Sequence, residues 1–225
     1  YRPELVSFIN QARKHPRLEN FRFHTKIIFN SNLTETLEGS DCIVIAVPSH
    51  SVRDIMKQSA NIAPKNAIIV NLAKGIENDT LRTMSQVIKE VTKIDESHIV
   101  SLYGPSHAEE VIAGYPTTLV SASIGKSSAN YVQKVFSSNM IRVYTNDDIY
   151  GVELGGSLKN VIAIAAGICD GLGFGDNTKA ALLTRGIAEI TRLGVAMGAN
   201  STTFNGLSGI GDLIATCLSK HSRNR

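Results

Sequence analysis

One lysine stands in the most apolar stretch of the chain. Between Glu153 and Asp170 the only charged residue is Lys159, and its neighbours are mainly glycines, alanines and branched aliphatic residues. A buried ammonium group without a partner is costly or loses its proton. Desolvation lowers the pKa of a lysine, which provides an amine that can exchange a proton near neutral pH. Lys159 is therefore a candidate catalytic base, with a lysine that snorkels to the surface as the alternative.

A glycine-rich run near the end of the chain contains a candidate partner for this lysine. GLSGIGDLIATC (206–217) places three glycines in a helical neighbourhood, which favours the close approach of another segment. Asp212 and Thr216 are four residues apart, so they share one face of a helix. Glu153 is six residues from Lys159 and does not face it. We therefore expect Asp212 to be the carboxylate that meets Lys159.

Two further polar features suit a ligand. Lys74 directly follows the apolar run AIIVNLA, and open parallel sheets bind ligands beyond the carboxyl ends of their strands. Its ammonium can reach such a crevice, although a solvated loop lysine is the alternative. An arginine lies between a hydroxyl donor and an amide donor in the run Ser222, Arg223 and Asn224. This set suits an oxyanion or phosphate clamp, with a polar tail as the alternative.

The run GPSHA (104–108) is close to the G-x-S-x-G turn of hydrolases, which makes Ser106 a rival nucleophile. The last residue is alanine rather than glycine, and Ser106 with Glu109 forms a capping-box pattern that explains the serine structurally. His50 and His107 are weaker acid–base candidates, because a lone histidine is more often a turn or cap residue. The six histidines contain no HExxH pattern, so we expect no metal site.

Strands and helices alternate over the first two thirds of the chain, and only helices follow. The runs CIVIAV, AIIVNL and IVSLY are apolar on both faces, which is typical of strands in a sheet covered on both sides. The alternation predicts an α/β domain with right-handed βαβ units and a mostly parallel sheet over 1–146, and a helical domain over 147–225. The predicted strands are 26–29, 42–47, 67–72, 99–103, 118–122 and 141–144. The predicted helices are 3–14, 33–38, 51–60, 80–93, 106–113, 127–137, 148–170, 177–198 and 202–220.

The composition narrows the class of protein. Hydrophobic residues make up 43% of the 225 residues and charged residues 19%, so a substantial core can form. The net charge of +3 is spread over the chain and does not favour nucleic acid. Three distant cysteines predict a reduced, cytoplasmic protein without a disulfide framework. The apolar stretch 154–169 is too short for a membrane span and contains a lysine, so we expect none.

A dinucleotide-binding fold usually begins with a G-x-G-x-x-G loop between its first strand and helix, and this sequence contains no such motif. Either the fold binds another ligand, or the chain lacks the first β-turn-α unit of a longer protein. We expect the second case, since the chain begins at what resembles the helix after a second strand.

Several segments together resemble one enzyme family. They are VPSH (47–50), AKGIE (73–77), GPSHAEEV (104–111), RVYTNDDIYGVELGGSLKNVIAIAAGICDGLGFGDN (142–177), TRGIAEITRLG (184–194), GLSGIGDLIATC (206–217) and SRNR (222–225). The chain resembles the bacterial-type NAD(P)-dependent glycerol-3-phosphate dehydrogenases over nearly its whole length. The resemblance implies a Rossmann-type domain followed by an all-α domain, with the amino-terminal glycine loop and a further carboxyl-terminal segment of the family absent here.

The resemblance also implies roles for individual residues. Lys159 would be the proton-exchanging base, and Lys74 would lie near both the nicotinamide and the substrate. The other implied substrate contacts are Gly104, Ser106, Asp212, Ser222, Arg223 and Asn224, with Asn160 and Thr216 as second-rank candidates. The other implied cofactor contacts are Ala108 and Arg223, and the cofactor would be NAD or NADP.

The predicted function is the interconversion of sn-glycerol 3-phosphate and dihydroxyacetone phosphate, which supplies glycerol phosphate for phospholipid synthesis in this family. One alternative is a related hydroxy-acid dehydrogenase such as a 6-phosphogluconate-like enzyme, against which Asp212 and the 222–224 set argue. Another is a non-catalytic ligand-binding fragment, which the missing glycine loop favours. The sequence does not determine the oligomeric state. A homodimer is the assembly that we consider.

Overall fold

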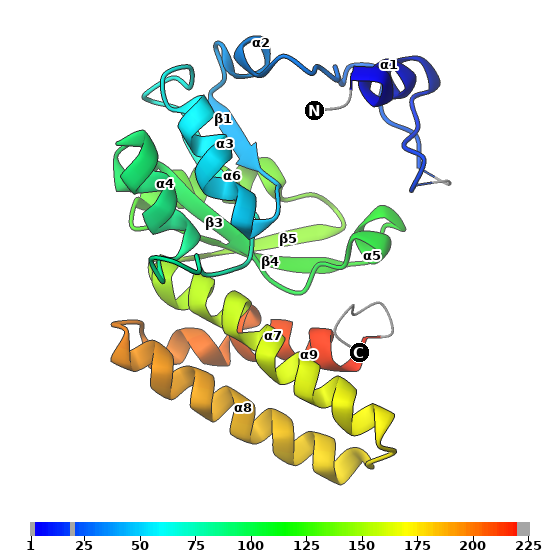
Figure 1. The fold of residues 1–225 in the computed structure, drawn as a ribbon, viewed down its shortest axis with the longest axis vertical. Helices are drawn as coiled ribbons and strands as arrows, with labels where there is room; N and C mark the ends of the chain where they lie inside the picture. Colours follow the sequence, from blue (N-terminus) through cyan, green and yellow to red (C-terminus); the bar gives the residue numbers. More distant parts are fainter. Residues whose placement is uncertain (1–2, 19–20, 220–225) are drawn as a thin grey trace.

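The computed structural model describes residues 3–18 and 21–219. A five-stranded sheet with helices on both faces forms the upper part of Figure 1, and long helices lie below it. The predicted order, an α/β part followed by a helical part, is confirmed. The strands are β1 (Cys42–Ile45), β2 (Ile68–Asn71), β3 (Ile99–Tyr103), β4 (Thr117–Ala122) and β5 (Ile141–Asn146). The helices of this part are α1 (Pro3–Ala12), α2 (Leu33–Leu37), α3 (Val52–Ser59), α4 (Met84–Thr92), α5 (Ala108–Ile112) and α6 (Lys126–Phe136).

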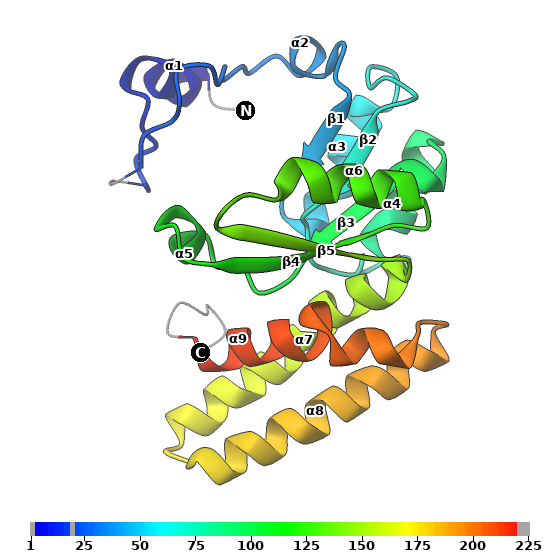
Figure 2. The same ribbon diagram turned by 180° about the vertical axis from the view of Figure 1, so that it is seen from behind.

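The sheet has the strand order β1-β2-β3-β4-β5, and its two faces carry separate cores. Helices α3 and α4 cover one face, and α6 covers the other (Figures 1 and 2). Every residue of β3 is buried, as the apolar run IVSLY predicts for a strand covered on both sides. The run CIVIAV behaves differently, because β1 is an edge strand of this sheet and Val44 is 44% exposed.

One strand pair departs from the parallel arrangement. β3 and β4 are antiparallel, whereas β1–β2, β2–β3 and β4–β5 are parallel. A parallel connection must carry the chain back along the strand, usually with a helix laid across the sheet. The only helix between β3 and β4 is α5, whose five residues span about 7.5 Å at 1.5 Å per residue. β4 returns antiparallel to β3 after this short helix.

Some predicted elements are wrong. No strand forms at 26–29; instead the Asn10 side chain bonds both the N–H and the carbonyl of Phe29. The predicted helix 80–93 begins only at Met84, because Thr83 and Gln86 form a capping box there. The capping box predicted at Ser106 is absent, since α5 begins at Ala108 without a side-chain cap.

The helical part begins with α7 (Ile149–Gly171), which is shared between the two parts. Its first turns pack in the core of the sheet through Ile149 and Val152, and its later turns pack against other helices. The boundary at 146/147 lies just before this helix and stays a prediction. After α8 (Asp176–Ala196), the predicted helix 202–220 is divided into three pieces. They are the 3₁₀ helix η3 (Ser201–Asn205), the π-helical turn η4 (Leu207–Gly211) and α9 (Asp212–Leu218).

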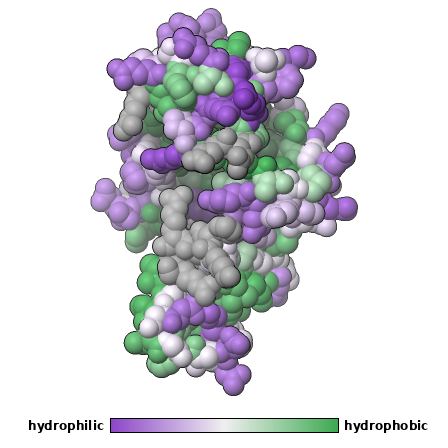
Figure 3. All heavy atoms as spheres, turned by 90° about the vertical axis from the view of Figure 1, so that its right-hand side faces the viewer, coloured by the Kyte–Doolittle hydropathy of each residue, from purple (hydrophilic) through white to green (hydrophobic). Residues whose placement is uncertain are grey.

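Helix α7 is long and apolar enough to cross a membrane by length and composition. It nevertheless packs against both α8 and α9, and it carries the buried side chains of Glu153 and Lys159. We interpret it as the core helix of the helical part. Apolar side chains also gather on the outside of this part (Figure 3). Near the end of α7, the side chains of Ile164, Ile168 and Leu172 are each more than half exposed.

Candidate active site

Three charged side chains from distant parts of the chain meet where the sheet contacts the helices. The Lys159 ammonium of α7 forms an ion pair with Oδ1 of Asp212, the first residue of α9. Oδ2 of the same carboxylate accepts a 2.6 Å hydrogen bond from Lys74, which follows β2. The partner predicted for Lys159 is therefore confirmed. Lys159 and Asp212 are buried, whereas the Lys74 side chain keeps 24% of its exposure and opens the cluster toward solvent.

Thr216 fixes the direction of the Lys159 amine. Its hydroxyl donates to the backbone carbonyl of Asp212 at 2.7 Å and accepts a hydrogen bond from Lys159 at 2.8 Å. Asp212 and Thr216 thus share a helix face, as their spacing predicts. A lysine amine has three bonding directions, and two of them point at Asp212 and Thr216 within the described residues.

The cluster has the electrostatics of an acid–base site. Burial is the main cause that lowers the pKa of Lys159 from its ordinary value of 10.5 to about 8, and the positive charge of Lys74 acts in the same direction. The Asp212 carboxylate opposes both effects but does not overcome them. A lysine with a pKa near neutrality can exchange a proton at physiological pH, so the apolar context of Lys159 has the chemical consequence that the sequence predicts.

The loop after β3 joins this cluster through its backbone. The buried Gly104 carbonyl accepts hydrogen bonds from Lys74 at 3.0 Å and from the Ser106 hydroxyl at 3.3 Å. Ser106 is exposed and has no histidine among its described hydrogen-bond partners, so nothing supports it as a nucleophile. A hollow of about 410 Å³ opens beside this loop, between α5 and α9. The Gly104 carbonyl therefore links Ser106 to Lys74.

Five further residues are predicted for this site. Ser222, Arg223 and Asn224 lie outside the described residues. Asn160 is half-buried on α7 next to Lys159, and Ala108 is exposed at the start of α5. The roles of all five stay predictions.

Two adjacent glycines allow the cluster to form. The predicted close approach in the glycine-rich region occurs between α7 and η4, where a Cβ on Gly155 would lie 2.8 Å from the Ser208 carbonyl oxygen. On the neighbouring side, a Cβ on Gly156 would lie 2.6 Å from the Tyr103 ring and 3.7 Å from the Lys74 side chain. α7 therefore carries Lys159 to Asp212 and Lys74 only because these two positions lack side chains.

We expect Gly156→Ala to destabilise the protein by about 1–3 kcal/mol, the usual cost of overpacking a core. The Tyr103 ring that the new methyl group would meet is fully buried and cannot move freely. Gly171→Ala, at the end of the same helix, has nothing within 4 Å of its added Cβ and is the matched control. Urea unfolding of both variants measures the difference. Equal midpoints for Gly156→Ala and the wild type would show that the contact relaxes at no cost.

The sequence interpretation missed a second buried charge. Glu153 is completely buried in α7, where its carboxylate accepts hydrogen bonds from groups on α4, β2 and β3. Burial raises its pKa, and hydrogen bonds from Ser85, Thr83 and Ser101 oppose that effect. The signal was the same as for Lys159, a charged residue within an apolar helix, but its partners are too distant in sequence to recognise.

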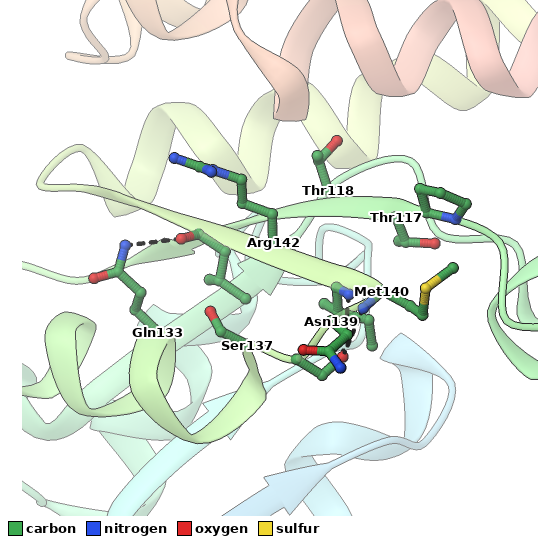
Figure 4. A pocket seen from close by; sticks show the side chains of 11 residues that line it. Thr117, Thr118, Gln133, Ser137, Asn139, Met140 and Arg142 are labelled. Carbon is green, nitrogen blue, oxygen red and sulfur yellow. Dashed lines mark hydrogen bonds between the residues drawn. The ribbon is translucent and has the colours of Figure 1, made fainter.

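A hollow elsewhere is unlike this site. It has a volume of about 610 Å³ and is lined by β4, β5 and the end of α6 (Figure 4). Arg142 is the one charged group among its lining residues, and its guanidinium lies over the Tyr144 ring. We assign this hollow no chemical role.

The comparisons with known proteins agree with this geometry. A family model described as "NAD-dependent glycerol-3-phosphate dehydrogenase N-terminus" matches residues 1–129, and the model of the corresponding C-terminus matches residues 148–225. The chain belongs to the NAD-dependent glycerol-3-phosphate dehydrogenase family. The candidate site of this family member lies where its two matched regions meet.

Individual relatives carry the same name. A glycerol-3-phosphate dehydrogenase [NAD(P)+] from Thermoanaerobacter sp. is 57% identical over 89% of this chain, and one from Fusobacterium nucleatum is 52% identical over 96%. The chain spans 60% and 64% of these two relatives. The crystal structure of the glycerol-3-phosphate dehydrogenase from Coxiella burnetii superposes with a TM-score of 0.92 at 33% identity. The superposition covers 100% of this chain and 68% of the Coxiella burnetii chain.

The residues present fit one end of a nicotinamide dinucleotide. β1, β2 and β3 are parallel, and Lys74 and Gly104 follow two of their carboxyl ends, the edge where open α/β sheets bind nucleotides. Lys74 and the exposed Ser106 hydroxyl supply donors there. A pyrophosphate loop of the G-x-G-x-x-G type is not in this sequence. The site therefore offers hydrogen-bond donors at the edge of the sheet where such a cofactor would bind.

Proposed function

We propose that the protein of which this chain is part interconverts sn-glycerol 3-phosphate and dihydroxyacetone phosphate with NAD or NADP. One observation carries the proposal. The buried Lys159 amine is bonded to Asp212 and Thr216, and Asp212 also bonds Lys74 at the edge of the sheet. The names of the relatives indicate the reaction, and the cluster contains a base and a cation that suit it.

In the direction of oxidation, neutral Lys159 accepts the proton of the substrate's C2 hydroxyl. Asp212 and Thr216 hold the amine while its third bonding direction faces the substrate. The Lys74 ammonium lies on the other oxygen of Asp212 and stabilises negative charge that develops on the substrate oxygen. The bound nicotinamide supplies the chemistry of hydride acceptance and donation.

The remaining contacts belong to the same proposal. Ser106 and the backbone at Gly104 would contact the substrate, and Ser222, Arg223 and Asn224 would bind its phosphate as a bidentate clamp. Asn160 would support the same pocket. Lys74, Ala108 and Arg223 would contact the cofactor.

The pH dependence tests the proposed role of Lys159. We expect kcat/KM for oxidation to rise about tenfold per pH unit below a pKa of about 8, and then to level off, because only the neutral amine accepts a proton. The reverse reaction needs the protonated amine and should slow above the same pH. Rates are measured above about pH 7, where the substrate phosphate, with a second pKa of about 6, is ionised. A flat profile for the full-length enzyme would exclude an ionising base of this pKa.

A substrate panel separates the reaction from its alternatives. The full-length enzyme should reduce NAD or NADP with sn-glycerol 3-phosphate and not with 6-phosphogluconate or unphosphorylated hydroxy acids. Turnover of 6-phosphogluconate would favour the related dehydrogenase, and binding without any turnover would favour a ligand-binding role.

The cellular setting is also proposed. We infer a cytoplasmic enzyme whose product supplies glycerol phosphate for phospholipid synthesis. A homodimer is proposed as its assembly, for which the exposed apolar residues Ile164, Ile168 and Leu172 offer a surface. Sedimentation of the full-length protein decides this point, and a monomer at micromolar concentration would contradict it.

A further inference from the structure

A buried hydrogen-bonded network lies directly beneath Lys74. The Glu153 carboxylate accepts hydrogen bonds from the backbone N–H of Ser85 at 2.9 Å, from the Ser85 hydroxyl at 2.6 Å and from Ser101 at 2.7 Å. The Asn71 amide lies 3.4 Å from the same carboxylate. Glu153, Ser101 and Asn71 are completely buried. This arrangement joins α7 to α4, β2 and β3 at one point.

The network continues to the backbone just before Lys74. Asn71 donates to the Ala73 carbonyl at 3.2 Å and accepts from the Ala73 N–H at 2.9 Å. The buried Tyr103 hydroxyl also donates to the Ala73 carbonyl, and Asn71 donates to the Tyr103 oxygen at 3.0 Å. Both polar groups of Ala73 are therefore held, so the backbone from which Lys74 projects is fixed.

Tyr103 also contacts the Lys74 side chain. The Lys74 ammonium lies 5.7 Å from the centre of the Tyr103 ring, within range of a cation–π interaction. The ring also lies close to Gly156 of α7, where an added Cβ would be 2.6 Å from it. Tyr103 thus bonds the carbonyl before Lys74 and also supports its charged end.

We propose that Tyr103, Asn71 and Glu153 form a positioning network that holds Lys74 on Asp212. The inference rests on the proposed function, and it concerns residues that act through Lys74 and touch neither substrate nor cofactor. The position of Lys74 matters because Lys74 and Lys159 share the Asp212 carboxylate. Lys74 bonds one of its oxygens and Lys159 bonds the other, so the position of each lysine depends on the other. A displaced Lys74 would therefore change the Lys159 site as well.

The test uses Tyr103→Phe in the full-length enzyme, a change that removes only the hydroxyl group. We expect kcat/KM to fall about 10-fold or more, since small misplacements of a site group are costly. The pH above which kcat/KM for oxidation levels off should increase. The positive charge of Lys74 lowers the pKa of Lys159, and this effect becomes smaller when Lys74 is held less closely. Among the described residues, the charged or titratable groups that face Lys159 are Lys74, Asp212 and Cys217. Tyr150→Phe is the matched control, because it removes a hydroxyl bonded to Glu96 outside the network.

A double-mutant cycle shows whether Tyr103 acts through Lys74. In a Lys74→Ala background, Tyr103→Phe should change kcat/KM by less than about twofold, because the group that it positions is gone. Equal losses in both backgrounds would overturn the proposal and indicate a general structural effect. Asn71→Ser, which removes the other donor to the Ala73 carbonyl, is the second variant if Tyr103→Phe does not fold.

Hydrogen exchange separates this inference from the proposed reaction. Tyr103→Phe should speed amide exchange in the peptide that contains Lys74 and Gly75, and Tyr150→Phe should not. If the wild-type enzyme has no activity with glycerol 3-phosphate but the exchange result holds, the proposed reaction is wrong and the network stands. If the enzyme is active and Tyr103→Phe changes neither exchange nor the pH profile, the positioning network is wrong.

Discussion

Lys159→Ala in the full-length enzyme should lower kcat by about 10²-fold or more, the scale of lost acid–base catalysis. The variant removes the buried amine that Asp212 and Thr216 both bond. Asp212 keeps Lys74 as its partner, so the variant does not leave a buried carboxylate alone. The loss should therefore be chemical rather than structural.

Two measurements distinguish these causes. The thermal midpoint of Lys159→Ala should stay close to that of the wild type, and added small primary amines should restore part of the rate by occupying the vacated space. Lys179→Ala is the matched control, because Lys179 is also largely buried and forms an ion pair with Asp170 in the helical part. Its kcat should stay within about twofold of the wild type. If the two lysine variants lose the same activity, Lys159 has no special role.

Asp212→Asn should have the largest effect on stability. It leaves the Lys74 and Lys159 ammonium groups on opposite sides of a neutral amide that is buried. Removing one partner of a buried ion pair typically costs about 3–5 kcal/mol, because the remaining charge is uncompensated. The partial exposure of Lys74 places the expected value at the lower end of this range. Activity should fall with it, since both lysines lose their common anchor.

The loss of stability in Asp212→Asn should be smaller at higher pH. Without the carboxylate, the pKa of Lys159 should fall below about 8, because Asp212 is the group that raises it. The folded state then binds fewer protons than the unfolded state between that pKa and the ordinary value near 10.5, and stability rises with pH over this window. Urea unfolding at neutral pH and at about pH 9 should thus show a smaller loss at the higher pH. Asp170→Asn is the matched control, and a loss of the same size at both pH values would contradict the explanation.

The local pattern was enough to predict most of the elements that carry the site. β2, β3 and α7 form within a few residues of their predicted bounds, because their apolar runs are long enough to be buried in only one way. The position of Lys74 at a strand end, and the apolar surroundings of Lys159, are likewise properties of neighbouring residues. Each could therefore be connected with a ligand or a proton before the fold was known.

The tertiary structure decided how these residues combine. The Lys74–Asp212 pair joins positions 138 residues apart, and the Glu153 contacts with Ser85 and Asn71 join positions 68 and 82 apart. No periodicity records such pairs, since they depend on which strands are neighbours and on how closely α7 approaches them. The antiparallel return of β4 shows the same limit, because the residue pattern of β4 does not record the direction in which it pairs. Desolvation at Lys159 arises only when the sheet and the helices close around it, and this closure gives an ordinary lysine the pKa of a base.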